Sequence, residues 1–302
     1  MSAVLWDERA EQEKFEMMDR HYTFGVALVT VSALIWASAG IFTRGVDADA
    51  WSVIFWRGLA ATGFTLGYLV LRRGLRAEWR RMQAPAWVAT LLMASGTAAF
   101  IPAFKLSSVA NVALIWATAP FVTAGLAWVL LRERPSQRVV FASLATAAGV
   151  GIMAWGSLQR GGLVGDFLAF WMTLMMSASF LIYRRWPETP AALPAALSAA
   201  LLVPVAYVFT DPAEVIVSER WILVAFGAVF AAASVLMLEG ARRIPAAEVA
   251  LIGALETPLA PVLAFLILSE TPPAASLTGG VLIFAAVVWA QINGMRRNAR
   301  RV

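Results

Sequence analysis

Val112-Ala113-Leu114-Ile115 recurs 137 residues later as Val249-Ala250-Leu251-Ile252, inside a longer internal match. Both copies lie in long apolar runs of the chain. Secondary transporters are often built from two similar halves, with the substrate site where the halves meet. The repeat therefore predicts a duplicated membrane protein. Other residues recur at the same offset: Ala110, Ala117, Leu126, Ala127, Leu131, Glu133 and Pro135 match Ala247, Ala254, Leu263, Ala264, Leu268, Glu270 and Pro272.

The composition is that of a membrane protein. Hydrophobic residues make up 60% of it, charged residues only 14%, and the mean hydropathy is +0.73. A soluble domain of this size could not bury so much apolar surface. The chain has no cysteine, and its only histidine, His21, precedes the first apolar segment. Thiol chemistry and intramembrane imidazole chemistry are thereby excluded, and we expect no metal site and no cofactor.

The chain divides into ten continuous apolar segments. Each is close to the roughly 20 residues that an α-helix needs to cross a bilayer core. We therefore expect an all-α polytopic membrane protein with ten transmembrane helices. The segments are Phe24–Phe42, Trp51–Leu71, Trp87–Phe104, Val109–Leu131, Val139–Ser157, Phe167–Ile182, Leu193–Phe209, Trp221–Leu238, Ala246–Leu268 and Leu277–Ile292.

Basic residues are distributed very unevenly between the two sides of such a bundle. The side of the N-terminus receives 19 of the 24 lysines and arginines, and the other side receives four: Arg44, Lys105, Arg160 and Arg220. Lys and Arg accumulate in cytoplasmic loops, so both termini are expected in the cytoplasm and the protein in a bacterial inner membrane. Because the arginines border spans, we expect no nucleic-acid partner.

Five spans in each half make the second half enter the membrane from the opposite side. The sequence thus predicts two inverted five-helix repeats, which permit alternating access to a shared site. We expect a cytoplasmic tail at 1–21, repeats at 22–158 and 159–295, and a basic cytoplasmic tail at 296–302. A single bundle of this kind can hold a complete pathway, so a monomer is sufficient.

The chain resembles the drug/metabolite transporter superfamily with its two EamA-type repeats. The resemblance rests on Ser107–Leu114 running to Ala119-Pro120 and Leu130–Glu133, and on Pro245–Leu251 running to Glu256-Thr257-Pro258 and Leu268–Glu270. Gly165-Asp166 resembles the usual start of the second repeat. Within the superfamily, the chain is most similar to bacterial aromatic amino acid exporters of the YddG type. The resemblance implies a central cavity lined by spans one, three, four, six, eight and nine.

Glu256 is the most pointed candidate for a transport role. At 1.5 Å per residue it lies about 15 Å into the ninth span, near the middle of the bilayer. Pro258, two residues later, removes a helical hydrogen bond and is expected to kink the helix. A carboxylate beside an interrupted helix suits a substrate ammonium group or a coupling proton. The alternative is a protonated glutamate that bonds a neighbouring helix.

Other polar residues lie within or at the ends of the apolar segments, where each needs a partner or a function. Glu248 shares a helix face with Glu256 and either faces the pathway, is solvated, or pairs with Arg242 or Arg243. Arg57 binds a substrate carboxylate, pairs with an acid, or extends to the interface. The remaining polar candidates are Asn111 and Thr118 in span four, where Pro120 is expected to cause a second kink, and Ser38 and Ser179 in spans one and six.

Aromatic residues in the middle of spans could contact an apolar or aromatic substrate. The candidates are Trp36, Trp116 and Trp171, with Tyr183 nearer the cytoplasm. Their rings can stack on a substrate ring or attract an ammonium group, although packing is the commoner role.

These features favour a secondary, ATP-independent transporter that exports small amphipathic metabolites, most of all aromatic or other neutral amino acids. A zwitterion needs few net charges, a mid-depth acceptor and apolar walls. The alternative is efflux of lipophilic cations by a multidrug transporter. An intramembrane enzyme is disfavoured, because such sites need a His, a Cys, an Asp pair or a metal cluster.

Overall fold

The fold is described from a computed structural model of the whole chain. It describes residues 2–38, 42, 46–106, 112, 115–116, 118–134, 136–155, 163–256, 259, 263, 266 and 274–299. Within these residues the regular structure is entirely helical. Five helices are long and apolar enough to cross a membrane, namely Ala50–Leu71, Ala84–Ala103, Leu163–Arg185, Ala192–Phe209 and Val217–Ala241.

Every apolar segment expected from the sequence overlaps at least one helix. The count of ten spans and the cytoplasmic location of both termini stay predictions. The elements are α1 (Ser2–Ala37), α3 (Ala50–Leu71), α4 (Leu75–Arg80), α5 (Ala84–Leu106), α7 (Ala119–Leu126) continued by the π-helical segment η1 (Ala127–Leu131), α8 (Gln137–Trp155), α9 (Leu163–Arg185), α10 (Ala192–Phe209), α11 (Val217–Ala241), α12 (Ala246–Gly253) and α14 (Ala274–Ala299).

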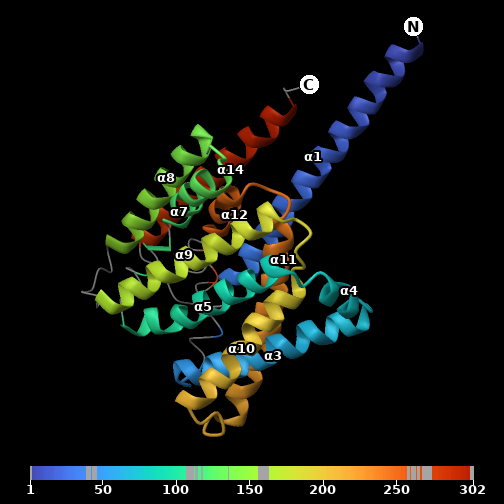
Figure 1. The fold of residues 1–302 in the computed structure, drawn as a ribbon. Coiled ribbons are helices and arrows are strands. Elements are labelled where there is room, and N and C mark those ends of the chain that lie inside the picture. The colour runs from blue at the N-terminus through green and yellow to red at the C-terminus, as the bar shows by residue number, and fades with distance from the viewer. Residues whose placement is uncertain are drawn as a thin grey trace.

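Helices of the two halves pack against each other in a reciprocal pattern (Figure 1). The third long helix of each half packs on the first long helix of the other, as α5 on α9 and as α11 on α1. The second long helices pair with each other, as α3 with α10, and so do the last, as α8 with α14. α7 of the first half also meets α12 of the second. Exchanging the two halves therefore maps the main contacts onto one another.

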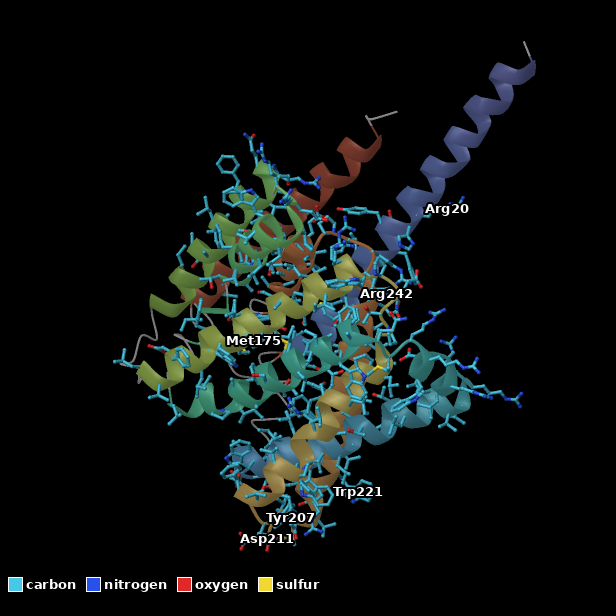
Figure 2. The ribbon with its side chains drawn as sticks, viewed as in Figure 1. Arg20, Met175, Tyr207, Asp211, Trp221 and Arg242 are labelled. Atoms are coloured by element: carbon cyan, nitrogen blue, oxygen red, sulfur yellow. The ribbon has the colours of Figure 1, made fainter. Side chains whose placement is uncertain are left out.

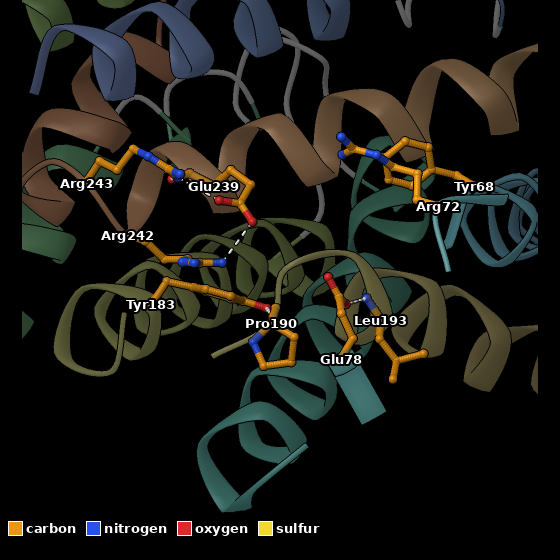
Figure 3. Close-up of polar contacts among 9 residues, drawn as sticks. All are labelled: Tyr68, Arg72, Glu78, Tyr183, Pro190, Leu193, Glu239, Arg242 and Arg243. Carbon is orange, nitrogen blue, oxygen red and sulfur yellow. Dashed lines mark hydrogen bonds and ion pairs between the residues drawn. The ribbon is translucent and has the colours of Figure 1, made fainter. Parts of the chain in front are cut away.

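α3 and α10 run antiparallel, and a carboxylate holds the N-terminus of each. Asp49 caps α3 by accepting from the amides of Trp51 and Ser52 at 2.8 and 3.2 Å, and Thr210, just beyond α10, donates to it at 2.9 Å. At the other end, Glu78 of α4 accepts from the Leu193 amide of α10 at 2.7 Å (Figure 3). Negative groups are favoured at helix N-termini, so these bonds join the two halves at both ends of the pair.

The two carboxyls titrate differently because they are buried to different extents. Burial opposes ionisation of Asp49, but hydrogen bonds from Ser52, Thr210 and the backbone prevail and lower its pKa. For Glu78, burial is the larger effect and raises the pKa, against the bonds from Leu193 and Ala192. Hydrogen bonds to the charged form therefore lower the pKa of Asp49, whereas removal from water raises that of Glu78, although both carboxyls cap helices.

Both termini lie at the same end of the molecule (Figure 1). Arg20 and Arg242 lie towards this end, whereas Asp211 and Trp221 lie at the far end (Figure 2). We call these the termini end and the far end. α1 is one continuous helix of 36 residues, and its N-terminal part projects beyond the bundle. The extension is consistent with a tail that precedes the first expected span.

Candidate functional site

Arg57 lies in the interior with its positive charge against aromatic rings. Arg57 is only 3% exposed. Its guanidinium carbon lies 4.4 Å from the centre of the Phe230 ring and 5.5 Å from that of Phe226. Among the described residues no carboxylate pairs with it, and its Nε has no hydrogen-bond partner. A charge buried without an opposite charge is costly, so Arg57 is the most unusual polar side chain among the described residues of the interior.

Gly227 allows α11 to come close enough to α3 to make these contacts. A Cβ at this position would lie 2.5 Å from the Cβ of Ala60 and 2.7 Å from the carbonyl oxygen of Arg57. Only a glycine fits against that backbone. The close approach places Phe226 and Phe230, on either side of Gly227 in sequence, where their rings reach the guanidinium.

A small cavity and a further ring complete the surroundings of Arg57. Trp36 of α1 meets Phe230 edge to face, with ring centres 5.0 Å apart. The cavity beside Arg57 is lined by α3, α5, α10 and α11, through Ile54, Arg57, Gly58, Thr97, Ser198, Ala199, Leu202 and Phe230. Arg57, Trp36 and Phe230 thus form one cluster, drawn from three spans, with a cation, aromatic surface and nearby hydroxyls.

Glu256 and Trp116 are brought together from opposite halves. The side chain of Trp116 hydrogen-bonds the carboxyl of Glu256, and both residues are partly buried. α12 ends at Gly253, followed by a turn at Ala254 and Leu255. Glu256 therefore lies just beyond the end of a helix, as the sequence suggested. Pro258, the expected cause of the interruption, lies outside the described residues.

Glu248 is held by two residues of the first half. Its Oε1 lies 2.7 Å from Nη2 of Arg138 on α8, and its Oε2 accepts from the Tyr22 hydroxyl of α1 at 2.6 Å. The expected pairing of Glu248 with Arg242 or Arg243 is wrong. Both of these arginines bind Glu239, one helical turn before them (Figure 3). Side chains three or four residues apart along a helix are neighbours, so Glu239 pairs readily with both arginines. Glu248 instead pairs with residues of other helices.

The hydroxyl candidates are bonded within their own helices. The hydroxyls of Ser38, Thr118 and Ser179 donate to the carbonyls of Ile35, Ile115 and Met176, at 2.6, 2.6 and 2.7 Å. Each proton already has an acceptor, so each oxygen can offer a ligand only its lone pairs. Such back-bonding is a common way to satisfy a hydroxyl in a membrane helix.

Tyr183 and Trp171 occupy contrasting positions. Tyr183 is fully buried and donates to the Pro190 carbonyl at 3.1 Å, beneath the loop between α9 and α10 (Figure 3). Trp171 is 38% exposed, stacks on Phe167 and donates to the Ser95 hydroxyl at 2.8 Å. Tyr183 thus lies at the termini end, and Trp171 at the edge of the α5–α9 contact.

Pro120, the expected cause of a kink in the fourth apolar segment, lies at the start of α7. α7 begins at Ala119 with Thr118 as its N-cap, so Pro120 lies in the first turn of a new helix. Proline fits there because the amide it lacks has no helical acceptor. Asn111, the other candidate in this span, lies outside the described residues.

Sequence reasoning missed Phe226, Phe230, Arg138 and Tyr22. The two phenylalanines follow the ordinary composition of an apolar span, and no pattern in the sequence separates them from packing residues. Gly227, between them in α11, was an available signal, because an isolated glycine in a helix marks a close approach. Arg138 and Tyr22 stand at predicted span ends, where interface residues are common.

The described helices form two similar halves that pack on each other, and five of them are long and apolar enough to cross a membrane. The model of the EamA-like transporter family matches residues 23–155 and again 163–291. The chain therefore belongs to the EamA-like transporter family, with two repeats. No curated protein matches the chain.

One solved structure, described only as a crystal structure of a protein, is similar to this chain with a TM-score of 0.78. The two sequences are 17% identical, and the match covers 89% of this chain and 97% of that one. At this identity the likeness shows the fold alone.

Proposed function

We propose that the protein is a secondary transporter that exports aromatic or other neutral amino acids by alternating access. In this proposal it spans a bacterial inner membrane ten times, with both termini in the cytoplasm and the halves inverted. The antiparallel course of α3 and α10, the second helices of the two repeats, supports the inversion. The observation that carries the substrate class is the buried Arg57 against Phe230 and Phe226.

Arg57 is suited to the carboxylate of an amino acid. A guanidinium presents paired donors that match the two oxygens of a carboxylate. The cluster around it offers the faces and edges of Trp36 and Phe230 to an aromatic side chain. Charge neutralisation and ring contact at one place favour a substrate that has both an acid and an apolar ring.

Glu256 is the group that we assign to the substrate ammonium or to a coupling proton. Its bond to Trp116 joins the two halves, so a ligand that competes for the carboxyl would also alter that contact. A carboxyl at an interrupted helix can exchange partners without breaking a helical hydrogen bond. The roles of Trp171, Tyr183, Glu248, Thr118, Ser38 and Ser179 along the pathway remain proposals of the same kind.

Efflux of lipophilic cations is the second candidate function. The pairing of Glu256 with Trp116 favours it, since an acid beside an aromatic ring attracts organic cations. Arg57 opposes it, because a buried positive charge repels a cationic substrate. Membership of a transporter family favours transport over an intramembrane enzyme.

The test is uptake of labelled phenylalanine and tryptophan into proteoliposomes of the purified protein. Phenylalanine uptake should saturate and be competed by other neutral amino acids. Phenethylamine, which lacks the carboxylate, should compete poorly. Arg57→Gln should abolish uptake, Glu256→Gln should reduce it or remove its proton dependence, and Arg185→Gln is the control for loss of a surface charge.

Two results would overturn the amino-acid proposal. One is protein-dependent movement of lipophilic cations without any movement of amino acids, which identifies multidrug efflux. The other is competition by phenethylamine as strong as that by phenylalanine, which removes the role of the carboxylate.

A further inference from the structure

A groove opens on the surface where α3, α4 and α10 meet. Its volume is about 470 Å³, and its lining is Leu66, Leu75, Arg76, Trp79, Leu193 and Leu197. The leucines belong to an apolar cluster that also contains Leu69 and Ala192. Four of the six lining residues are leucines, so the floor is suited to a hydrocarbon chain.

The groove is bordered by positive charge. α4 and the turns that flank it carry five arginines and one acid, Glu78, whose carboxyl is bonded to the N-terminus of α10. Arg76 lies in the groove itself and is exposed. The five arginines, all exposed, are Arg72, Arg73, Arg76, Arg80 and Arg81.

The conformation of Arg73 is unusual for an arginine. It ends α3 in the left-handed region, with φ of 52°. The amide of Arg73 bonds to Val70 and that of Gly74 to Leu69, at 2.9 and 2.8 Å. This motif ordinarily places glycine where Arg73 stands, because a side chain there is strained. Arg132 has a similar conformation, with φ of 56°, so the strain is not specific to the groove.

α4 is fixed in place, so the groove is preformed. Glu78 binds the Leu193 amide at 2.7 Å (Figure 3). The ring of Trp79 meets that of Trp87 of α5 at nearly a right angle, with centres 6.4 Å apart. Tryptophan concentrates where lipid headgroups meet the acyl chains. Trp79 therefore gives the groove a residue type that is common at that depth.

We propose that this groove binds an anionic phospholipid of the surrounding bilayer. The acyl chain lies on Leu66, Leu75, Leu193 and Leu197, and the phosphate lies at Arg76. Charge complementarity selects this occupant, because juxtamembrane arginines attract anionic headgroups and a leucine floor excludes a soluble phosphate as the sole ligand. Since α3 and α4 belong to the first half and α10 to the second, the bound lipid touches both halves. The inference does not depend on the transported substrate.

The test measures quenching of tryptophan emission by brominated lipids in the purified, detergent-solubilised protein. Brominated phosphatidylglycerol is titrated against brominated phosphatidylcholine, and Trp79→Phe isolates the signal of Trp79. Phosphatidylglycerol should quench Trp79 at much lower concentration. Arg76→Gln should weaken phosphatidylglycerol binding about fivefold, the effect expected for about one interfacial charge. It should leave phosphatidylcholine unaffected.

Arg185→Gln is the matched control. Arg185 is also exposed, ends α9 at the termini end, and lies 5.5 Å above the Trp186 ring, outside the groove. Its loss should change phosphatidylglycerol binding by less than about twofold. Equal quenching by the two lipids would show an ordinary lipid-facing surface and overturn the proposal. Equal losses in Arg76→Gln and Arg185→Gln would show a general charge effect and also overturn it. If Arg76→Gln does not fold, the proposal is tested by comparing the two brominated lipids on the unaltered protein.

Discussion

Arg57 and Arg138 are both largely removed from water, but their surroundings differ. The side chain of Arg138 bonds Glu248, which is itself 5% exposed, at 2.7 Å. Arg57 rests on the rings of Phe230 and Phe226, with no acid beside it among the described residues. One charge is balanced by the protein, and the other is balanced only if a ligand supplies the anion.

The difference assigns different tasks to the two ends of the bundle. At the termini end, Arg138–Glu248 and Arg184–Glu133 join the first half to the second. These pairs oppose separation of the halves there. Arg57 instead makes weak contacts with rings, which a carboxylate can replace with stronger bonds. The Arg138–Glu248 pair thus contributes to stability, and the proposed function gives Arg57 a role in binding.

Glu248→Ala should produce the largest loss of stability. It removes the acid that pairs with Arg138 and accepts from the Tyr22 hydroxyl, at a cost of about 3 kcal/mol in the free energy of unfolding. Thermal unfolding in detergent measures it. The double variant Arg138→Met with Glu248→Leu should lose less than the single variant, because no buried charge is left alone. Equal losses would show that the ion pair is not responsible.

Arg57→Met should reverse that pattern. Stability should change by less than about 1 kcal/mol, because no acid is left unpaired. Phenylalanine transport should fall about 100-fold, the loss expected when a charged partner of a ligand is removed. Unfolding and transport are measured on the same preparation. If the variant is much less stable but its folded fraction transports phenylalanine normally, Arg57 has a structural role and the proposal is wrong.

Gly227→Ala should disturb the cluster around Arg57 without changing any charge. The added Cβ would overlap Ala60 and the backbone of Arg57, and overpacking of this kind costs about 1–3 kcal/mol. Gly67→Ala on α3 is the control, since nothing lies within 4 Å of its added Cβ. The control should keep full transport and gain some helix stability. Similar transport in both variants would contradict the proposed geometry.

Protonation of Asp49, which lies at the far end, should lower the free energy of unfolding in acid. Its pKa is lower in the folded protein than its usual value, so its contribution is present above the unfolded pKa and lost as the pH falls through the folded pKa. Asp49→Asn keeps a capping oxygen but removes this acid dependence. Between pH 7 and pH 3 the unaltered protein should therefore lose more stability than Asp49→Asn, as measured by unfolding at the two pH values. Parallel pH profiles would contradict the assignment.

Arg184→Gln should give the smallest effect. Arg184 and Glu133 are 3.3 Å apart, with side chains 32% and 41% exposed. Pairs this exposed contribute about 0.5 kcal/mol or less. Unfolding measured at low and high salt should show the small difference vanish as salt rises. A loss as large as that of Glu248→Ala would erase the distinction between buried and exposed pairs.

The sequence predicted the helices well because each span carries its own signal. The apolar run Leu193–Phe209 corresponds to α10 within one residue, since length and hydropathy suffice for a membrane helix. The interruption before Pro120 was likewise readable from a single residue.

The partners of the polar residues were much less predictable. Arg242 and Arg243 were possible partners of Glu248 because they are close to it in sequence, whereas the structure pairs it with Arg138, 110 residues away. Arg57 was singled out, but its rings come from α11, where Phe226 and Phe230 look like any apolar residues. Such contacts depend on how the spans cross, and a single sequence carries little information on that.

α1 belongs to both clusters that Arg57 and Arg138 define. Trp36 meets Phe230 beside Arg57, and Tyr22 binds Glu248 beside Arg138. The two residues are separated by about 21 Å of uninterrupted helix. A helix of that length behaves as a stiff rod, so a tilt or turn at one end must be transmitted to the other. A tilt of α1 that moves Trp36 relative to Phe230 would therefore also move Tyr22 relative to Glu248.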